Sequence, residues 1–438
     1  MDHAILVAAG TGIDGEKLSL YSGAVLGGIS QLQRLVITAE RAGIRRFTII
    51  TEKLDSSLKN LLKNDKRIKS EISWHQPGAQ VKFEHNPSLV LQSNLLTTPT
   101  GLSKLINCNV SEYEVAVLVD ENKDAWVKTR GENIEDVFAS GGKAVGAFVA
   151  HGSLLEKAIL DSMSLDSWIK ELVGRGSVRF IKFKDGYWMR LTSDEKSLKK
   201  AEDLIFSHVG KTETGWLSRN INSKISLPTS RILVRTPLTP NMISIIINLI
   251  GMLSGPFYAF GHPVLGAIFL QIATVLDRCD GEVARVKLME TKRGQWVDTI
   301  SDQFTVFSFI IGLHIGYYSI AKSPIAIVLA VFNLGVFLFF LIWSFYFLSK
   351  YTNSGSLVAY FNVDRIIGDE RRSYVHKLIG IVRPMSRRNF YSLAFLVLAA
   401  IGGYPWVLGT LSAGLLLFLI HQIEDIIKIR KLKTQPTL

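Results

Sequence analysis

Cysteine is scarce in this sequence, with two residues, Cys108 and Cys279, among 438. Two thiols in different halves of a chain exclude a disulfide framework and fit a reducing, cytoplasmic setting. The pattern of a secretion signal is also lacking, because residues 1–9 form a short apolar run that contains Asp2 and has no basic flank. We therefore expect the first part of the chain to lie in the cytoplasm.

Acidic residues are fewer than basic ones, with 38 Asp and Glu against 50 Lys and Arg and a formal net charge of +12. An excess of basic residues can bind nucleic acid, but many of the basic residues here flank long apolar segments. Basic flanks are typical of the cytoplasmic ends of membrane spans and of contact with anionic lipid. We therefore predict a lipid bilayer, and no nucleic acid, as a partner.

Long apolar runs are missing from the first half of the chain. Short apolar runs alternate there with charged stretches, whereas from Asn241 onward apolar segments of about twenty residues recur, long enough to cross a bilayer. A chain of 438 residues is also too long for one ordinary domain. We predict a cytoplasmic domain over residues 1–209, an interfacial amphipathic linker over 210–238 and a membrane domain over 239–438.

Strand-like and helix-like segments alternate in the first domain. Residues 3–9, 47–51 and 114–120 are predicted strands, and residues 30–42 and 194–207 are predicted helices. This alternation favours a mostly parallel sheet. The expected fold class has two parts, an N-terminal α/β doubly wound domain and a C-terminal all-α polytopic membrane domain.

The linker interleaves apolar residues such as Trp216, Ile225 and Ile232 with basic ones such as Lys224 and Arg231. Next to a membrane span, this pattern is typical of a helix that lies in the membrane interface. A solvated linker is the alternative.

Six transmembrane helices are predicted, near residues 241–260, 264–277, 299–319, 324–349, 390–402 and 405–427. Basic residues concentrate between residues 350 and 388 and in the tail, whereas the opposite loops hold one lysine in all. By the positive-inside rule the basic loops, both termini and the first domain are cytoplasmic. We expect a multi-pass protein of the cell membrane.

Four carboxylates, those of Asp277, Asp280, Asp298 and Asp302, lie among these apolar segments, where charge is costly unless it has a function. At about 100° per residue, Asp277 and Asp280 share one face of a helix, and Gly294, Asp298 and Asp302 form a stripe on another. If the two stripes face each other, the carboxylates converge and require divalent cations, with Mg²⁺ the best fit and Mn²⁺ the other candidate. A pair of such ions is suited to holding phosphate oxygens.

The spacing D-x2-D-G-x2-A-R-x8-G-x3-D-x3-D resembles the motif of the CDP-alcohol phosphotransferases at all eight specified positions. The resemblance implies that the hydroxyl of a second alcohol attacks the phosphorus of a CDP-alcohol and displaces CMP, which leaves a phosphodiester. It also implies a homodimer and two Mg²⁺ ions, with Asp302 as the general base. The implied ligands are Asp277, Asp280 and Asp298 for one ion, and Asp277, Asp298 and Asp302 for the other.

The same resemblance implies nucleotide contacts from Asn241, Gly281, Ala284, Arg285, Thr291 and Gly294. Small residues at Gly281 and Ala284 leave room for the cytidine, and Arg285 can grip phosphate as a fork. Ordinary helix contacts for the two small residues, and helix caps for Thr291 and Asn241, are the alternatives.

The acceptor is not specified by the motif. Many relatives accept a phosphorylated polyol, which needs cations near the metal ions. The candidates are Lys287, Lys292, Arg293, Arg365, Arg371, Arg372 and Arg388; a purely topological role is the alternative for about half of them. A lipid donor and a soluble, inositol-type donor both stay open, and the fused first domain favours the second.

The first domain resembles the sugar-phosphate nucleotidyltransferases in its opening strand and glycine-rich loop, residues 5–12. Asp120 matches that family's first metal-binding aspartate, but Arg190 stands where the second is expected, and Ile13 replaces an arginine after the glycines. A cation at a metal position repels the metal. We predict a degenerate domain kept as a scaffold, regulatory module or weak nucleotide site. The alternative is a bifunctional enzyme whose first domain also makes the CDP-alcohol.

Two other hypotheses account for the four acids. They could form salt bridges with Arg278 and Arg285 for structure alone, or line the ion path of an ion-coupled transporter. Neither requires the glycines and the alanine at their places in the motif. The phosphotransferase hypothesis does, so it is the function that we expect.

Overall fold

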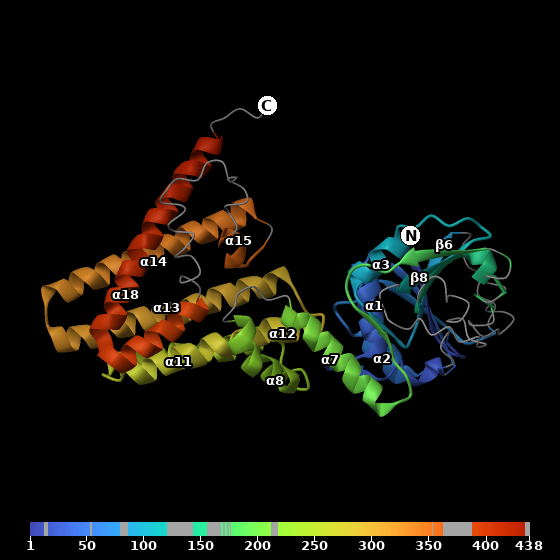
Figure 1. The fold of residues 1–438 in the computed structure, drawn as a ribbon, viewed down its shortest axis with the longest axis horizontal. Helices are drawn as coiled ribbons and strands as arrows, with labels where there is room; N and C mark the ends of the chain where they lie inside the picture. Colours follow the sequence, from blue (N-terminus) through green and yellow to red (C-terminus); the bar gives the residue numbers. More distant parts are fainter. Residues whose placement is uncertain are drawn as a thin grey trace. The chain divides into compact units, whose positions relative to one another are not determined.

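The computed structural model describes the chain in two compact units, Met1–His208 and Val209–Leu438 (Figure 1). The residues that it does not describe are 13–15, 53–54, 79–85, 121–142, 156–167, 170, 173–174, 176, 212–217, 353, 362–387 and 434–438.

The first unit is built on a seven-stranded sheet with the order β10-β8-β9-β6-β1-β4-β5. Four neighbouring pairs are parallel, and β9 runs antiparallel between β6 and β8. The prediction of an α/β first part is therefore confirmed. The strands are β1 (His3–Ala8), β4 (Arg46–Thr51), β5 (Glu71–His75), β6 (Pro87–Gln92), β8 (Val115–Asp120), β9 (Lys143–His151) and β10 (Val178–Lys182).

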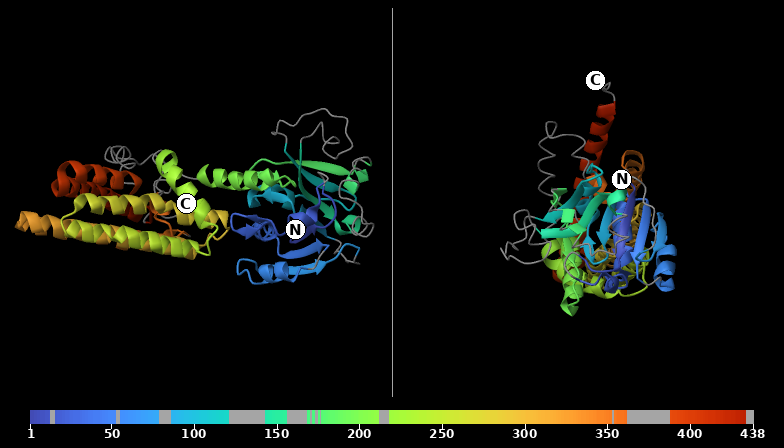
Figure 2. Two further views of the ribbon diagram at one scale, coloured as in Figure 1. Left: turned by 90° about the horizontal axis from the view of Figure 1, so that it is seen from below. Right: turned by 90° about the vertical axis from the view of Figure 1, so that its right-hand side faces the viewer.

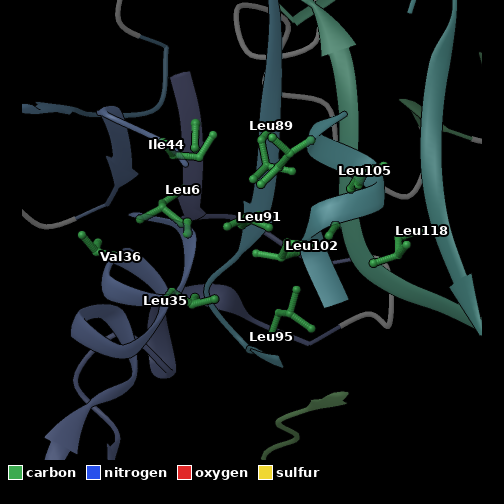
Figure 3. Packing of buried hydrophobic residues seen from close by; sticks show 14 of the residues in the cluster. Leu6, Leu35, Val36, Ile44, Leu89, Leu91, Leu95, Leu102, Leu105 and Leu118 are labelled. Carbon is green, nitrogen blue, oxygen red and sulfur yellow. The ribbon is translucent and has the colours of Figure 1, made fainter. Parts of the chain in front are cut away.

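Alternation along the strands divides the core between the two faces of the sheet. Leu6 of β1 packs with the helices α1 (Gln31–Arg41) and α3 (Pro99–Ile106), as Figure 3 shows, whereas Ile5 packs into the cluster on the other face. A capping box at Ser30 and Gln33 fixes the start of α1. The remaining elements are η1 (Leu18–Leu20), β2 (Val25–Leu26), β3 (Ile29–Ser30), α2 (Ser56–Lys63), β7 (Leu95–Thr97), β11 (Trp188–Arg190) and α7 (Glu195–Lys211).

All secondary-structure elements in the described residues of the second unit are helices, and α13 and α14 lie side by side within it (Figures 1 and 2). It begins within the last turn of α7, and η2 (Ser218–Asn222) and the connector helix α8 (Ser223–Leu233) follow. The helices that follow are α9 (Pro240–Met252), α10 (Ser254–Ala259), α11 (Pro263–Leu276), α12 (Arg278–Val286), α13 (Lys292–Ala321), α14 (Pro324–Tyr351), α15 (Leu357–Phe361) and α18 (Arg388–Lys433).

Four helical segments in the described part of the chain are long and apolar enough to cross a membrane: Pro240–Ala259, Lys292–Ala321, Pro324–Tyr351 and Arg388–Glu424. The six predicted spans are therefore not confirmed. The second predicted span lies in α11, which has 14 residues before the charged motif begins. The fifth and sixth lie together in α18, where Gly403 breaks the helix with φ 61° and ψ −144°.

Glycine allows the helices of the second unit to approach closely. A Cβ atom added at Gly312 of α13 would overlap the backbone carbonyl of Gly255 in α10. Backbones that meet at glycines are typical of helix packing in membranes, where van der Waals contact replaces the hydrophobic effect. This contact places α13, which carries two of the motif carboxylates, against the α9–α10 pair.

We expect Gly312→Ala to destabilise the second unit by about 1–3 kcal/mol, because the added methyl group forces two helix backbones apart. Thermal unfolding of the purified protein in detergent measures this. Gly335→Ala in α14 is the matched control, because a Cβ there meets nothing within 4 Å. Equal unfolding midpoints for the two variants would contradict the packing described.

Candidate metal centre

The acidic motif lies at a junction between two helices. Asp277 ends α11 and directly precedes α12, and its own φ of −47° and ψ of −32° are helical, so the chain passes from an apolar helix into a charged one with little interruption. Asp280 lies in the first turn of α12. Asp298 and Asp302 lie four residues apart on α13, and therefore on one face.

Carboxylate oxygens of Asp277, Asp298 and Asp302 all lie within 4.8 Å of one another. Asp280 is outside this group of three, but its carboxyl interacts electrostatically with those of Asp298 and Asp302. Its Oδ2 accepts from the Ser244 hydroxyl and its Oδ1 from the Gly281 N–H. The structure thus brings the four motif carboxylates to one place, from the α11–α12 junction and α13.

A divalent cation fits this donor set. Oδ1 of Asp298 is buried and has no hydrogen-bond partner among the described residues. The described cation at the group is Arg388, the first residue of α18, whose Nη1 lies 3.3 Å from Asp277 Oδ1 and 2.5 Å from Asp302 Oδ1. One guanidinium does not balance this many carboxylates, and hard oxygen ligands are those that Mg²⁺ and Mn²⁺ prefer.

Burial also changes the acidity of the group. The pKa of the Asp280 carboxyl is raised above its usual value, chiefly because burial removes water from the charged form, although the Ser244 hydroxyl opposes this shift. A bound cation favours the charged form of a nearby carboxylate. The site is therefore electrostatically suited to metal ions.

A row of polar side chains joins α9 to α13 beneath the carboxylates. Asn248 is buried, and its Nδ2 donates to Ser301 Oγ at 3.0 Å while its Oδ1 accepts from Thr305 Oγ1 at 2.7 Å. Ser301 lies between Asp298 and Asp302, so these bonds orient that face of α13. The sequence analysis missed Ser244 and Asn248, although two polar residues four apart in an apolar helix were a usable signal.

Three of the predicted nucleotide contacts lie together. A Cβ added at Gly294 would lie 3.1 Å from Thr291 Oγ1 and 3.2 Å from Asn241 Oδ1. Thr291 is also the N-cap of α13, since its hydroxyl accepts from the Gly294 N–H at 2.9 Å. On α12, a Cβ at Gly281 would approach Arg285 Nη2 to 3.6 Å, so these two residues also adjoin. Ala284, on the same helix, is partly buried.

The predicted acceptor-binding cations are in different situations. Arg388 contacts the carboxylates, as described above. Lys287 is buried, and its Nζ donates to the carbonyls of Thr236 and Leu238 at 2.8 and 3.3 Å, so it binds the segment that follows α8. Lys292 and Arg293 are exposed at the start of α13. Three further candidates lie outside the described residues: Arg365, Arg371 and Arg372.

The first unit gathers polar residues near the ends of its strands β6 and β8. Asp120 ends β8 and its Oδ2 accepts from Trp188 Nε1 at 2.6 Å. A Cβ added at Gly146 would lie 3.2 Å from Gln92 Oε1 and 3.5 Å from Arg190 Cδ, so these three residues adjoin. Gln92, which ends β6, is fully buried and its amide has no hydrogen-bond partner among the described residues. The carboxyl edge of parallel strands is the usual place for ligands in such sheets.

Comparison with known proteins shows which ones this chain is similar to. Residues 237–363 match the family model described as CDP-alcohol phosphatidyltransferase. The protein "Bifunctional IPC transferase and DIPP synthase" of Aquifex aeolicus is 26% identical over 343 residues, which cover 72% of this chain and 77% of that protein. The protein of the same description from Archaeoglobus fulgidus is 34% identical over 131 residues, covering 30% of this chain and 26% of its own length. Among solved structures, the inositol-1-phosphate CTP transferase from T. maritima has a TM-score of 0.35 and 14% identity, covering 47% of this chain and 96% of that one.

We expect Asp298→Asn to abolish Mn²⁺ binding in the concentration range where the unaltered protein binds it, because the substitution removes charge at the centre of the carboxylate group. Electron paramagnetic resonance of the free ion measures this in purified protein. Asp185→Asn, an exposed position in the first unit, is the charge-matched control. Retained Mn²⁺ binding in Asp298→Asn would rule out the centre as drawn.

Proposed function

We propose that the chain moves the phospho-alcohol group of a CDP-alcohol to the hydroxyl of a second alcohol, releasing CMP. The match of residues 237–363 to the CDP-alcohol phosphatidyltransferase model and the similarity to a transferase of Aquifex aeolicus support this proposal. The observation that carries the proposal is the meeting of Asp277, Asp298 and Asp302 within 4.8 Å, with a buried Asp298 oxygen left without a partner in the described structure. Two Mg²⁺ ions held by these residues and Asp280 would neutralise the diphosphate of the donor.

The chain's own residues supply the general base and the nucleotide contacts. Asp302 takes the proton of the acceptor hydroxyl. The oxygen of that hydroxyl bonds to the phosphorus that carries the first alcohol, and the bond from this phosphorus to CMP breaks. Asn241, Thr291 and Gly294 form one side of the proposed nucleotide site, and Gly281 with Arg285 forms another. The small side chains leave room for the cytidine, and the guanidinium pairs with phosphate.

Arg388 is the best-placed group for an acceptor that carries a phosphate. Its Nη1 contacts Asp277 and Asp302, while its Nε and Nη2 are buried and have no hydrogen-bond partner among the described residues. Those two donors can bind a phosphate in a fork while Nη1 stays on the acids. We propose an inositol-phosphate-type acceptor on this basis, assisted by Lys292 and Arg293. We also propose a homodimer of the cell membrane with this site on the cytoplasmic side.

The expected result is Mg²⁺-dependent release of labelled CMP from a CDP-alcohol when a phosphorylated polyol is added to the protein in lipid vesicles. Asp302→Asn should lose this activity, and Arg388→Lys should raise the KM for a phosphorylated acceptor more than for an uncharged one. A panel of lipid and soluble CDP-alcohols identifies the donor. If no donor yields CMP, the proposal fails, and ion flux coupled to a substrate would instead support the transporter hypothesis.

A second candidate activity belongs to the first unit. The similarity to the bifunctional Aquifex aeolicus protein spans 72% of this chain, so it extends well beyond residues 237–363. We propose on this ground that the first unit makes the CDP-alcohol from CTP and a polyol phosphate, with Asp120 as the metal-binding residue. Arg190 then binds a phosphate in place of a second metal ligand. This proposal takes the bifunctional alternative in preference to a degenerate domain.

Incubation of the protein with CTP and inositol phosphate should release pyrophosphate, and Asp120→Asn should abolish that release. Asp302→Asn is the matched control, because it should stop CMP release by the second unit and leave pyrophosphate release intact. Arg190→Ala should weaken CTP or polyol-phosphate binding, which isothermal titration measures. If the unaltered protein binds CTP without releasing pyrophosphate, the first unit is a nucleotide-binding module and not a second enzyme.

A further inference from the structure

The connector helix α8 is polar where it is buried and apolar where it is exposed. Ser226 and Ser230 are fully buried, whereas Ile225 and Ile232 are 51% and 68% exposed. At about 100° per residue the two isoleucines share one side of the helix and the two serines lie on the other. A helix that turns its serines inward requires a polar partner there.

That partner is Glu282 of α12, whose side chain is 0% exposed. Its Oε1 accepts a hydrogen bond from the Ser226 hydroxyl at 2.7 Å, and its Oε2 accepts one from the Ser230 hydroxyl at 2.7 Å. Arg278 Nη2 forms an ion pair with Oε1 at 3.2 Å. A buried carboxylate is costly unless it is paired and hydrogen-bonded, and here each oxygen has its own hydroxyl.

Further contacts hold α12 to the connector helix and to the segment that follows it. Cys279 Sγ lies 3.6 Å from the Ser226 carbonyl oxygen, and Lys287 binds the carbonyls of Thr236 and Leu238. Asp280 lies two residues before Glu282, or about 200° around α12. Glu282 therefore contacts the connector helix on the side of α12 that lies opposite Asp280.

We propose that Glu282 is a positioning residue for the metal centre. Its hydrogen bonds to Ser226 and Ser230 fix the rotation of α12 about its axis, and thereby the direction of Asp280 and of Asp277 at the helix junction. Apolar residues would stabilise such a helix contact equally well. A carboxylate that is hydrogen-bonded at both oxygens also fixes the orientation of α12 relative to α8, because each hydrogen bond has a preferred direction. The role of Glu282 in catalysis rests on the proposed function. Its effect on the geometry of the carboxylates does not, because metal affinity can be measured without turnover.

The test is Mn²⁺ affinity, measured by electron paramagnetic resonance of the free ion, in full-length protein in lipid nanodiscs. We expect Glu282→Gln, and Ser226→Ala combined with Ser230→Ala, to weaken Mn²⁺ binding about tenfold, the low end of the range for residues that orient metal ligands. Thr229→Ala is the control on the same helix, because its hydroxyl donates to the Ile225 carbonyl of α8 itself. It should bind Mn²⁺ as the unaltered protein does.

Thermal unfolding of the same samples separates positioning from folding. An unchanged unfolding midpoint with a tenfold weaker Mn²⁺ affinity supports the inference, and unchanged affinity in the folded serine variant overturns it. If Glu282→Gln does not fold, the single variant Ser230→Ala takes its place. Absence of Mn²⁺ binding in the unaltered protein would also overturn the inference. Failure of every donor to yield CMP, with Mn²⁺ binding intact, would refute the proposed reaction alone.

Discussion

Repulsion among the carboxylates of Asp277, Asp298 and Asp302 is the constraint on which the arrangement of the second unit depends. Oxygens within 4.8 Å of one another, set among apolar helices, cannot all stay charged unless positive charge is brought to them. Arg388 brings one such charge, yet a buried oxygen of Asp298 has no partner in the described part of the chain. The fold must therefore hold these side chains together against their own repulsion.

Contacts that never touch the carboxylate group supply that restraint. Asn248 ties α9 to α13, and Glu282 ties α12 to the connector helix. The glycine contact between Gly255 and Gly312 brings the α10 and α13 backbones together. Each of these lies on a helix that carries a motif carboxylate, or on a helix packed against one. Rigid elements of this kind are what precise metal sites require, since loops would let mutually repelling ligands move apart.

Spacing alone was enough to nominate the motif carboxylates, because residues that share a helix face are fixed by the 3.6-residue period. The α/β fold of the first unit was also predictable from the sequence, because strands buried on both faces have continuous apolar runs such as that of β1. The partners of Glu282 were not, because Ser226 and Ser230 lie more than fifty residues away and nothing in a sequence links them. The number of spans stays a prediction: four candidate spans are found in the described residues, and the fifth and sixth predicted spans lie on the two sides of the break at Gly403 in α18.

Deep in the second unit, Asn333 of α14 donates to His314 Nε2 of α13 and to Ser412 Oγ of α18 at 3.1 and 2.8 Å. Between apolar helices, such hydrogen bonds tolerate no sliding, because a displaced donor or acceptor meets only hydrocarbon. Ser412 lies beyond the break at Gly403, so a shift of the second part of α18 by a single turn, about 5.4 Å, would break this anchor. The break at Gly403 lies between this anchor and Arg388, so the two parts of α18 are held at different places: the second part by Asn333, and the first by the contacts of Arg388 with Asp277 and Asp302.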